Sequence, residues 1–379
     1  MAETRDYLQL FLADRPLLDV RAPVEFAQGA FPTAVNLPLL TDDERRRVGT
    51  CYKRHGRQAA IDLGHRLVDG TVKTARVEGW QAFFRHHPRG HLYCFRGGLR
   101  SKIAQQWLAE AGCNCLRIGG GYKAMRRFLL DALTSLPATL HPLVIGGRTG
   151  VGKTQLLKAL PPTIDPLDLE GLANHRGSGF GRRVTPQPSQ IDFEHALAIA
   201  LLKRVDRDPT AWLAVEDESR LIGSRALPQG LFQAMACAPI VLLEADLETR
   251  IEATLREYIF DMAAAFAAVG VHPPTGDAPW GFAGFRAYLL DSLDRIRKRL
   301  GGERHARLRR LILHALERQG ITGDIDLHRR WIRPLLVEYY DPMYDYQLQS
   351  KAPRVVFRGD RRAVLDWLAA LPRPGARGS

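Results

Sequence analysis

The sequence has few cysteines and no long apolar run. Five cysteines among 379 residues is an odd and small number, so a framework of disulfide bonds is excluded as the basis of the fold. No apolar run reaches the roughly 18 residues that a membrane-spanning helix needs. Acidic residues also interrupt the apolar stretch within the first sixteen residues, where a signal peptide would carry basic ones. We therefore expect a cytoplasmic protein with free thiols and no membrane contact.

Acidic residues are also in short supply. Asp and Glu number 41 against 54 Lys and Arg, which gives a net charge of +13 and a pI near 9.8. Residues 51–130 alone hold fifteen basic and four acidic residues. Residues 295–310 form a second basic cluster, in which Glu303 is the only acid. The excess predicts a polyanionic partner such as nucleic acid, although a solvated helix face explains the second cluster equally well.

Short apolar runs alternate with helical patterns along most of the chain, and this alternation is typical of parallel α/β sheets. The runs are 17–20, 91–94, 116–118, 143–145, 212–215 and 240–243. We predict one α/β domain over residues 1–136 and the core of a second over 137–245, joined by a proline-containing linker. Residues 246–379 are predicted to be mainly helical and to pack on the second domain.

One segment of the second domain matches a P-loop at every position of the motif. Residues 147–154 read G-R-T-G-V-G-K-T, after an apolar strand and before a helical run. The glycines let backbone amides face phosphate oxygens, the lysine supplies charge, and the threonine can bind Mg²⁺. The candidate phosphate-binding residues are Gly147, Gly150, Gly152, Lys153 and Thr154. Kinases, NTPases, sulfotransferases and pure binding proteins share this loop, so it does not name a reaction or establish that ATP binds.

Two further segments could complete a site beside the P-loop. Residues 216–218 are three acids that follow an apolar strand, and Asp217 is our preferred metal ligand; the alternative is that these acids cap the strand or pair with nearby arginines. Residues 174–183 are rich in glycine and arginine, which fits either a mobile anion-binding loop or a flexible surface loop. The sequence makes no metal site certain.

Cys94 is the candidate nucleophile of the first domain. It ends an apolar strand, and an amphipathic helical stretch follows the loop after it. Amides converging on the sulfur and two nearby guanidinium groups favour the thiolate, which is the reactive form. The loop residues expected to bind an anion are Arg96, Gly97, Gly98 and Arg100. A purely buried thiol would need neither the glycines nor the arginines. We assign no function to Cys51, Cys113, Cys115 or Cys237.

The first domain resembles a known family of domains. Residues 17–26, residues 29–38, the Cys94 loop and residues 119–125 are similar to the four successive signatures of a rhodanese domain. The resemblance implies a rhodanese-like fold for the first domain. It also implies transfer of sulfur or selenium through an adduct on the loop cysteine, which corresponds to Cys94.

A rhodanese domain joined to a P-loop domain resembles the tRNA 2-selenouridine synthase family, and residues 93–101 and 174–178 are similar to that family's own motifs. The resemblance implies a selenotransferase that replaces sulfur by selenium in the wobble 2-thiouridine of tRNA. It also implies an S-geranyl-2-thiouridine intermediate, with geranyl diphosphate and selenophosphate as co-substrates and an enzyme that supplies selenophosphate. Mainly through this resemblance, the site beside the P-loop gains three further candidate residues: His175, Arg176 and Ser178.

Phosphate chemistry suggests which site serves which step. We expect the P-loop to hold geranyl diphosphate, and the Cys94 loop to hold selenophosphate, since both are anions. One alternative is a thiosulfate or persulfide sulfurtransferase with an accessory nucleotide-binding domain. Another is a P-loop kinase or NTPase with a catalytically silent rhodanese domain, whose activity would survive replacement of Cys94.

Overall fold

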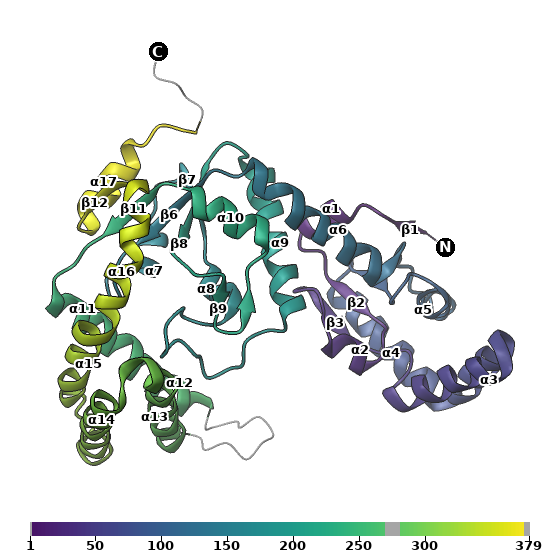
Figure 1. Ribbon diagram of the computed structural model, residues 1–379. Helices are drawn as coiled ribbons and strands as arrows, with labels where there is room; N and C mark the ends of the chain where they lie inside the picture. Colours follow the sequence, from purple (N-terminus) through teal and green to yellow (C-terminus); the bar gives the residue numbers. More distant parts are fainter. Residues whose placement is uncertain (1, 270–280, 375–379) are drawn as a thin grey trace. The chain divides into compact units, whose positions relative to one another are not determined.

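The computed structural model describes residues 2–269 and 281–374. The chain forms two compact units, one from residues 1–136 and 188–208 and the other from residues 137–187 and 209–379 (Figure 1). Each unit contains a five-stranded sheet whose strands are all parallel. The α/β fold class predicted from the alternating pattern is therefore confirmed.

The sheet of the first unit has the order β1-β5-β4-β2-β3. Its strands are β1 (Glu3–Thr4), β2 (Leu17–Asp19), β3 (Ala34–Asn36), β4 (His91–Tyr93) and β5 (Leu116–Ile118). Every residue of β2 and β4 is buried, as expected for inner strands of a sheet with both faces covered. The helices are α1 (Tyr7–Leu12), α2 (Pro23–Ala27), α3 (Asp42–Leu67), α4 (Gly70–His86), α5 (Leu99–Glu110), α6 (Gly121–Ser135) and α9 (Gln190–Arg207).

Helix α3 is long and exposed. It begins with a capping box, in which the Thr41 side chain accepts from the Glu44 amide and the Glu44 side chain accepts from the Thr41 amide. Gly56 has φ +81° and interrupts the helix with a kink, a conformation that glycine adopts without steric cost. In the next helix, α4, the Trp80 side chain is buried, and its indole nitrogen donates to the Leu37 carbonyl at 2.9 Å.

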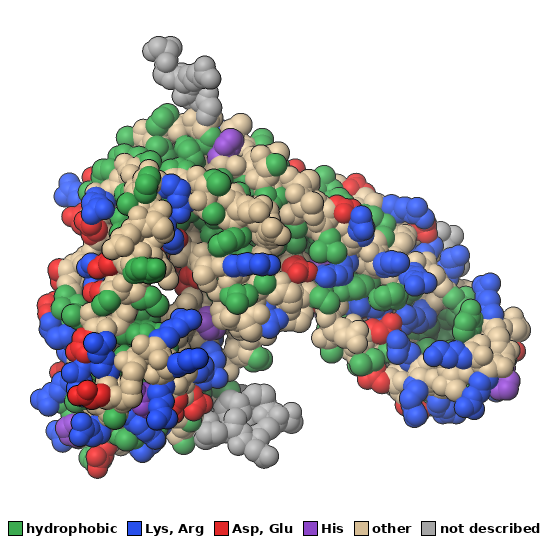
Figure 2. Space-filling view, viewed as in Figure 1, with side chains coloured by type: hydrophobic (Ala, Val, Ile, Leu, Met, Phe, Trp, Pro, Cys, Tyr) green, Lys and Arg blue, Asp and Glu red, His purple; other side chains and the backbone are tan. Residues whose placement is uncertain are grey.

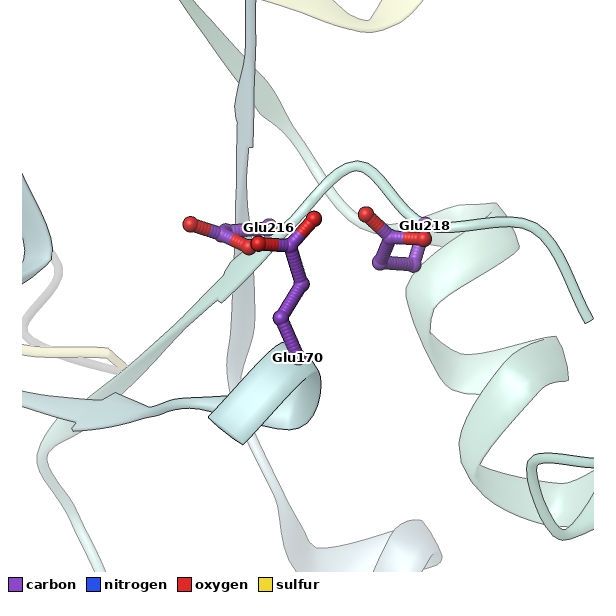
Figure 3. Close-up of side chains that lie close together, drawn as sticks. All are labelled: Glu170, Glu216 and Glu218. Atoms are coloured by element: carbon purple, nitrogen blue, oxygen red, sulfur yellow. The ribbon is translucent and has the colours of Figure 1, made fainter. Parts of the chain in front are cut away.

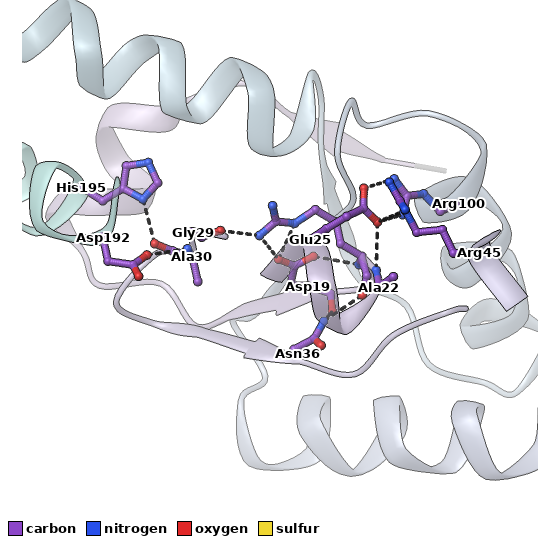
Figure 4. Close-up of polar contacts among 11 residues, drawn as sticks. Asp19, Ala22, Glu25, Gly29, Ala30, Asn36, Arg45, Arg100, Asp192 and His195 are labelled. Carbon is purple, nitrogen blue, oxygen red and sulfur yellow. Dashed lines mark hydrogen bonds and ion pairs between the residues drawn. The ribbon is translucent and has the colours of Figure 1, made fainter. Parts of the chain in front are cut away.

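Helix α9 belongs to the first unit, although it follows the P-loop in the sequence. The expected division placed residues 188–208 in the second domain; in the structure they pack against α6 and α1. Asp192 accepts from the Ala30 amide at 2.7 Å, and His195 Nδ1 donates to the Ala30 carbonyl at 2.7 Å (Figure 4). Because α9 has a buried apolar face like any core helix, its sequence alone does not indicate which sheet it covers.

The sheet of the second unit has the order β12-β11-β6-β8-β7. Its strands are β6 (Pro142–Gly146), β7 (Ile164–Leu167), β8 (Trp212–Glu216), β11 (Ile240–Leu243) and β12 (Val355–Gly359). A separate antiparallel pair joins β9 (Leu221–Ile222) to β10 (Arg225–Ala226). The helices that alternate with these strands are α7 (Lys153–Leu157), α8 (Leu169–Ala173) and α10 (Gln229–Cys237).

The segment after residue 246 is mainly helical, as predicted. It comprises α11 (Leu247–Leu255), α12 (Asp261–Val269), α13 (Gly281–Leu300), α14 (Gly302–Thr322), α15 (Arg329–Leu335), α16 (Asp341–Lys351) and α17 (Arg361–Ala370). Strand β12 was not predicted; it alternates half-buried and exposed residues because it lies at the edge of the sheet, beside β11. Two π-helical segments, Arg256–Phe260 and Leu336–Tyr340, follow α11 and α15.

No helix in the described part of the chain is both long and apolar enough to cross a membrane.

The contact between α9 and Ala30 predicts a pH-dependent stability of the first unit. Burial, together with the charge of Arg126, lowers the pKa of His195 to about 4, although its bond to Ala30 opposes the shift. Asp192 and Glu194 act in the opposite direction. Protonation is therefore easier in the unfolded chain, so stability is complete above the ordinary pKa near 6.5 and falls as the pH drops toward 4. Between pH 7.5 and pH 5 we expect this histidine to account for a loss of about 2 kcal/mol.

Urea denaturation at several pH values measures this loss. The His195→Gln variant should lose that part of the pH dependence, whereas a His55→Gln control on exposed helix α3 should retain it. Equal pH dependence in the wild-type protein and His195→Gln would contradict the assignment.

Candidate functional site

The Cys94 thiol lies at the end of β4, in the loop that leads to α5. Its side chain is 3% exposed, and Sγ lies 3.1 Å from the Ser101 hydroxyl. That hydroxyl donates to the Gly98 carbonyl at 3.1 Å, so it links the thiol to the first turn of α5. The thiol is thus positioned by the loop and the helix together, as the sequence predicts for a strand-loop-helix cysteine.

A turn that contains Gly120 and Gly121 packs against the Cys94 loop. The Tyr122 amide donates to the Cys94 carbonyl and the Lys123 amide to the Phe95 carbonyl, both at 2.9 Å. Gly97 has φ +63°, and a Cβ there would lie 2.8 Å from the Gly120 nitrogen. Gly121 has φ +58°, and its Cβ would collide with the Cys94 carbonyl oxygen. Only glycines at these positions let the two backbone segments meet.

Glu25 holds the cations near the thiol. Its carboxylate accepts from Arg100 at 2.5 and 3.1 Å and pairs with Arg45 at 3.1 Å (Figure 4). Burial alone would raise the pKa of Glu25 and lower that of Arg100, but their mutual hydrogen bonds reverse both effects. Arg100 is therefore a permanently charged, fixed group. Arg96 is exposed and lies 5.9 Å from the Phe95 ring centroid, so it is the loop arginine that can move toward an anion.

The P-loop connects β6 to α7 in the second unit. Gly147, Gly150 and Gly152 have φ values of +148°, +83° and +86°, which explains the glycines of the motif. Lys153 Nζ donates to the Gly147 carbonyl at 3.0 Å, and the Thr154 hydroxyl donates to Glu216 at 2.8 Å. The motif residues are thus brought together in one loop.

Two of the later helices brace this loop. Arg250 of α11 donates to the Thr149 carbonyl at 2.9 Å and pairs with Asp341 of α16. Arg148 forms a bidentate pair with Asp345 at 2.7 and 2.8 Å. These contacts explain why a helical segment far along the sequence packs on the P-loop.

Three glutamates gather beside Thr154. Glu216 ends β8, Glu218 lies two residues beyond it, and Glu170 comes from α8, with one carboxylate oxygen of each within 4.8 Å of the others (Figure 3). Burial and mutual repulsion raise the pKa of Glu216 to about 8 and that of Glu170 to about 7. Burial also raises the pKa of Glu218 to about 7, although Lys153 opposes the shift.

These carboxylates suit a divalent cation. Glu216 is 1% exposed, and its Oε2 atom has no hydrogen-bond partner among the described residues. Oxygen donors from carboxylates and a threonine hydroxyl are the ligands that Mg²⁺ prefers. The donor set around Glu216, Glu170, Glu218 and Thr154 therefore fits such an ion.

Asp217, the acid that we preferred from sequence, lies in a different contact. Lys351 at the end of α16 donates to both of its carboxylate oxygens, at 2.7 and 2.8 Å. In this structure Glu216, rather than Asp217, contacts the P-loop threonine. Register explains the difference: Glu216 is the last residue of β8 and pairs with Ile145 of β6, so it stands directly beside the start of the P-loop.

The glycine-rich segment 174–183 adjoins the glutamates. The Gly177 amide donates to Glu170 at 2.6 Å. Arg176 donates to the Glu257 carbonyl at 2.8 Å, and the Ser178 hydroxyl lies 2.9 Å from the Tyr258 hydroxyl. Burial, reinforced by arginines 295, 182 and 183, lowers the pKa of His175 to about 4. His175 is therefore neutral near pH 7 and does not supply the positive charge of this loop.

Glu170 and Glu25 were missed as site residues. The neighbouring strands β7 and β8 are parallel, and Leu167 pairs with Val215, so the acids after both strands meet at one edge of the sheet. That rule could have indicated Glu170 once the strand order was known. Glu25 lies within a recognised signature, but its contact with Arg100 spans 75 positions and has no local sequence signal.

Comparison with known proteins identifies relatives of this chain. The family model described as the tRNA 2-selenouridine synthase AAA domain matches residues 140–373, a range that contains the P-loop and the three glutamates. A tRNA 2-selenouridine synthase of Pseudomonas fluorescens Pf0-1 is 54% identical over 371 residues, 97% of each chain. The proteins of that name from Azotobacter vinelandii and Hahella chejuensis are each 55% identical and cover 97% of this chain, over 97% and 94% of their own lengths.

The chain belongs to the tRNA 2-selenouridine synthase family. The resemblance stated from the sequence is thereby confirmed, and it extends over nearly the whole chain.

The glycine turn behind Cys94 gives a test of the loop geometry. We expect Gly121→Ala to destabilise the first unit by about 2–4 kcal/mol, because the added methyl collides with the Cys94 carbonyl and the positive φ disfavours a side chain. Gly112 has φ +77° but open space around its Cβ position, so Gly112→Ala should cost only about 1 kcal/mol. Urea denaturation measures both, and equal losses would show that the contact with Cys94 carries no cost.

Proposed function

We propose that the chain is a tRNA 2-selenouridine synthase that works in two steps, alkylation of sulfur and then its replacement by selenium. The observation that carries this proposal is the presence, in one chain of this family, of a positioned thiol loop and a complete P-loop bordered by carboxylates. Its substrate would be tRNA that carries 2-thiouridine at the wobble position. A kinase or NTPase with a silent first domain would not need the thiol, the glycine turn and the fixed arginine of the Cys94 loop.

The first step would take place at the P-loop. Sulfur of 2-thiouridine attacks C1 of geranyl diphosphate, the C1–O bond breaks, and diphosphate and a proton leave. The protein would bind the diphosphate through the backbone amides of residues 147–154 and the charge of Lys153. Its contacts to the leaving group would strengthen as negative charge develops there. We propose that this loop binds geranyl diphosphate rather than hydrolysing ATP.

A divalent cation would assist at the same place. Glu216, Glu170, Glu218 and Thr154 would hold it. When bound, Mg²⁺ supplies charge that neutralises the departing diphosphate. Lys153, which already interacts with these glutamates, would retain the role of contacting phosphate oxygens.

The second step would take place at the Cys94 loop. Selenium of selenophosphate attacks C2 of the S-geranyl base, the C2–S bond breaks, and sulfur leaves as geranylthiol after taking a proton. Water then cleaves the P–Se bond to give phosphate and the 2-selenouridine. Arg96 and the loop amides around Gly97 and Gly98 would bind the selenophosphate. Arg100, held in place by Glu25, would keep the electrostatic potential beside the thiol positive.

Oxidation states restrict the role of Cys94 in this step. Selenium in selenophosphate is already at the level of selenide, so its transfer to carbon requires no redox change. A perselenide on Cys94 would require an oxidant that neither co-substrate supplies. Cys94 would instead act as a nucleophile at C2 or as a proton carrier, because either role balances without an oxidant.

The basic surfaces suit the tRNA backbone. Lys and Arg side chains gather over α3 in the first unit and over α13 and α14 in the second (Figure 2). Such side chains bind phosphates with a strong dependence on salt, and a wobble base is reached by splaying it out of its stack. A selenophosphate-producing enzyme would supply the donor, and the cytoplasm remains the predicted location.

Separate variants should block separate steps. Lys153→Ala should slow geranylation at least about 100-fold, because the developing diphosphate charge loses its main contact. Cys94→Ser should retain geranylation and slow selenation at least about 100-fold. Mass spectrometry of nucleosides from 2-thiouridine tRNA incubated with both co-substrates measures the two products. Lys158→Ala and Cys237→Ser, both at exposed positions, are the matched controls. Normal selenation by Cys94→Ser would contradict the thiol assignment.

The metal assignment predicts different effects for two adjacent acids. Glu216→Gln should raise the Mg²⁺ concentration for half-maximal geranylation at least about tenfold, because it removes a ligand charge. Asp217→Asn should shift it less, since Asp217 is paired with Lys351. Geranylation rates measured against Mg²⁺ concentration show which of the two acids, Glu216 or Asp217, binds the metal. A larger shift for Asp217→Asn, or no requirement for a divalent cation, would contradict the assignment.

A further inference from the structure

A large pocket adjoins Cys94 within the first unit. Its volume is about 1610 Å³, and Cys94, Arg96 and Arg100 line it together with residues of α3, α5 and α6. Pockets that hold a drug-sized molecule measure about 300–1,000 Å³. Selenophosphate has only five heavy atoms, so it would leave most of this space unfilled.

Much of the pocket wall is apolar. Two helices that flank the thiol, α3 and α5, contribute six of the apolar side chains: Val48, Ala60, Ile61, Leu99, Ile103 and Trp107. Leu99 follows the Cys94 loop directly and is 42% exposed. An anion gains nothing from such surroundings, whereas a hydrocarbon is stabilised by leaving water for them.

Two glycines of α3 line the pocket. Gly49 and Gly64 line it, although glycine inside a helix costs about 0.5–1 kcal/mol relative to alanine. A Cβ at Gly49 would meet no atom within 4 Å, and one at Gly64 would meet only Val48, at 3.9 Å. Close packing within the unit therefore does not require these glycines. Both positions leave room for a larger side chain beside the pocket.

Cations lie beside the apolar wall. Lys53 and Arg57 of α3 and Lys123 of α6 line the same pocket and are exposed, and Lys and Arg side chains are visible over α3 in Figure 2. Among the described residues that line it, Glu25 is the one acid, and two arginines already pair with its carboxylate. The pocket thus matches a ligand that carries phosphates and a hydrocarbon chain together.

We propose that this pocket binds the S-alkyl chain of the alkylated 2-thiouridine while selenium replaces sulfur beside Cys94. The inference rests on the proposed function and extends it, because it makes the hydrocarbon chain a recognition element of the second step. The chain would lie against α3 and α5, and the phosphates of the RNA would lie near Lys53, Arg57 and Lys123. The geranyl chain would then leave the pocket as part of the geranylthiol.

Two synthetic substrates test this role. Anticodon-stem RNAs that carry S-geranyl- or S-methyl-2-thiouridine are incubated with selenophosphate, and kcat/KM for selenouridine formation is measured for each. The wild-type protein should favour the S-geranyl substrate at least about tenfold, since several buried methylenes separate the two. Gly49→Leu places a side chain in the pocket and should reduce that ratio at least about tenfold.

A matched variant and a second pocket variant make the outcome decisive. Gly79 of α4 also has open space around its Cβ position and does not line the pocket, so Gly79→Leu should keep the wild-type ratio. Ile61→Asn serves as the pocket variant if Gly49→Leu does not fold. A wild-type ratio near one would overturn the inference, and so would equal losses on both substrates, which would assign the pocket to the nucleotide itself. Absence of selenouridine from both RNAs would instead overturn the proposed function, and the inference with it.

Discussion

Carboxylates that hold cations in fixed positions shape both sites of this protein. Glu25 fixes Arg100 beside the thiol. In the second unit Asp341 holds Arg250, and Arg250 in turn holds the P-loop backbone at Thr149. A cation bound to a buried carboxylate keeps its charge and loses its freedom, so anions meet a preformed site. Removing Asp341 would leave the buried guanidinium of Arg250 without its counter-ion, which is costly.

The three glutamates beside the P-loop are an exception to this pairing. Glu170, Glu216 and Glu218 lie close to one another, and burial together with the repulsion between like charges raises their pKa values. Lys153 opposes the repulsion only in part. Clusters of this kind are stabilised when a cation joins them, which connects the electrostatics of the site to the metal that we propose for diphosphate release.

The sequence was sufficient to predict the features that depend on local order. The P-loop, the Cys94 loop and the central strands have short-range signatures, because glycine conformations and buried strands act within a few residues. Features that depend on tertiary position could not be predicted. Helix α9 joins the first unit through Ala30, which is 162 positions from Asp192. The choice of Glu216 over Asp217 as the neighbour of Thr154 depends on the register of β8 against β6. Strand β12 carries an edge pattern of half-buried and exposed residues, with none buried.

The central claim is that alkylation must precede selenation, and the order of reagents tests it most directly. The wild-type protein is incubated with 2-thiouridine tRNA and geranyl diphosphate, selenophosphate, or both, and the nucleosides are identified by mass spectrometry. The account predicts S-geranyl-2-thiouridine with geranyl diphosphate alone, no change with selenophosphate alone, and 2-selenouridine with both. Formation of 2-selenouridine from selenophosphate alone would contradict it, because sulfur would then leave without having been alkylated.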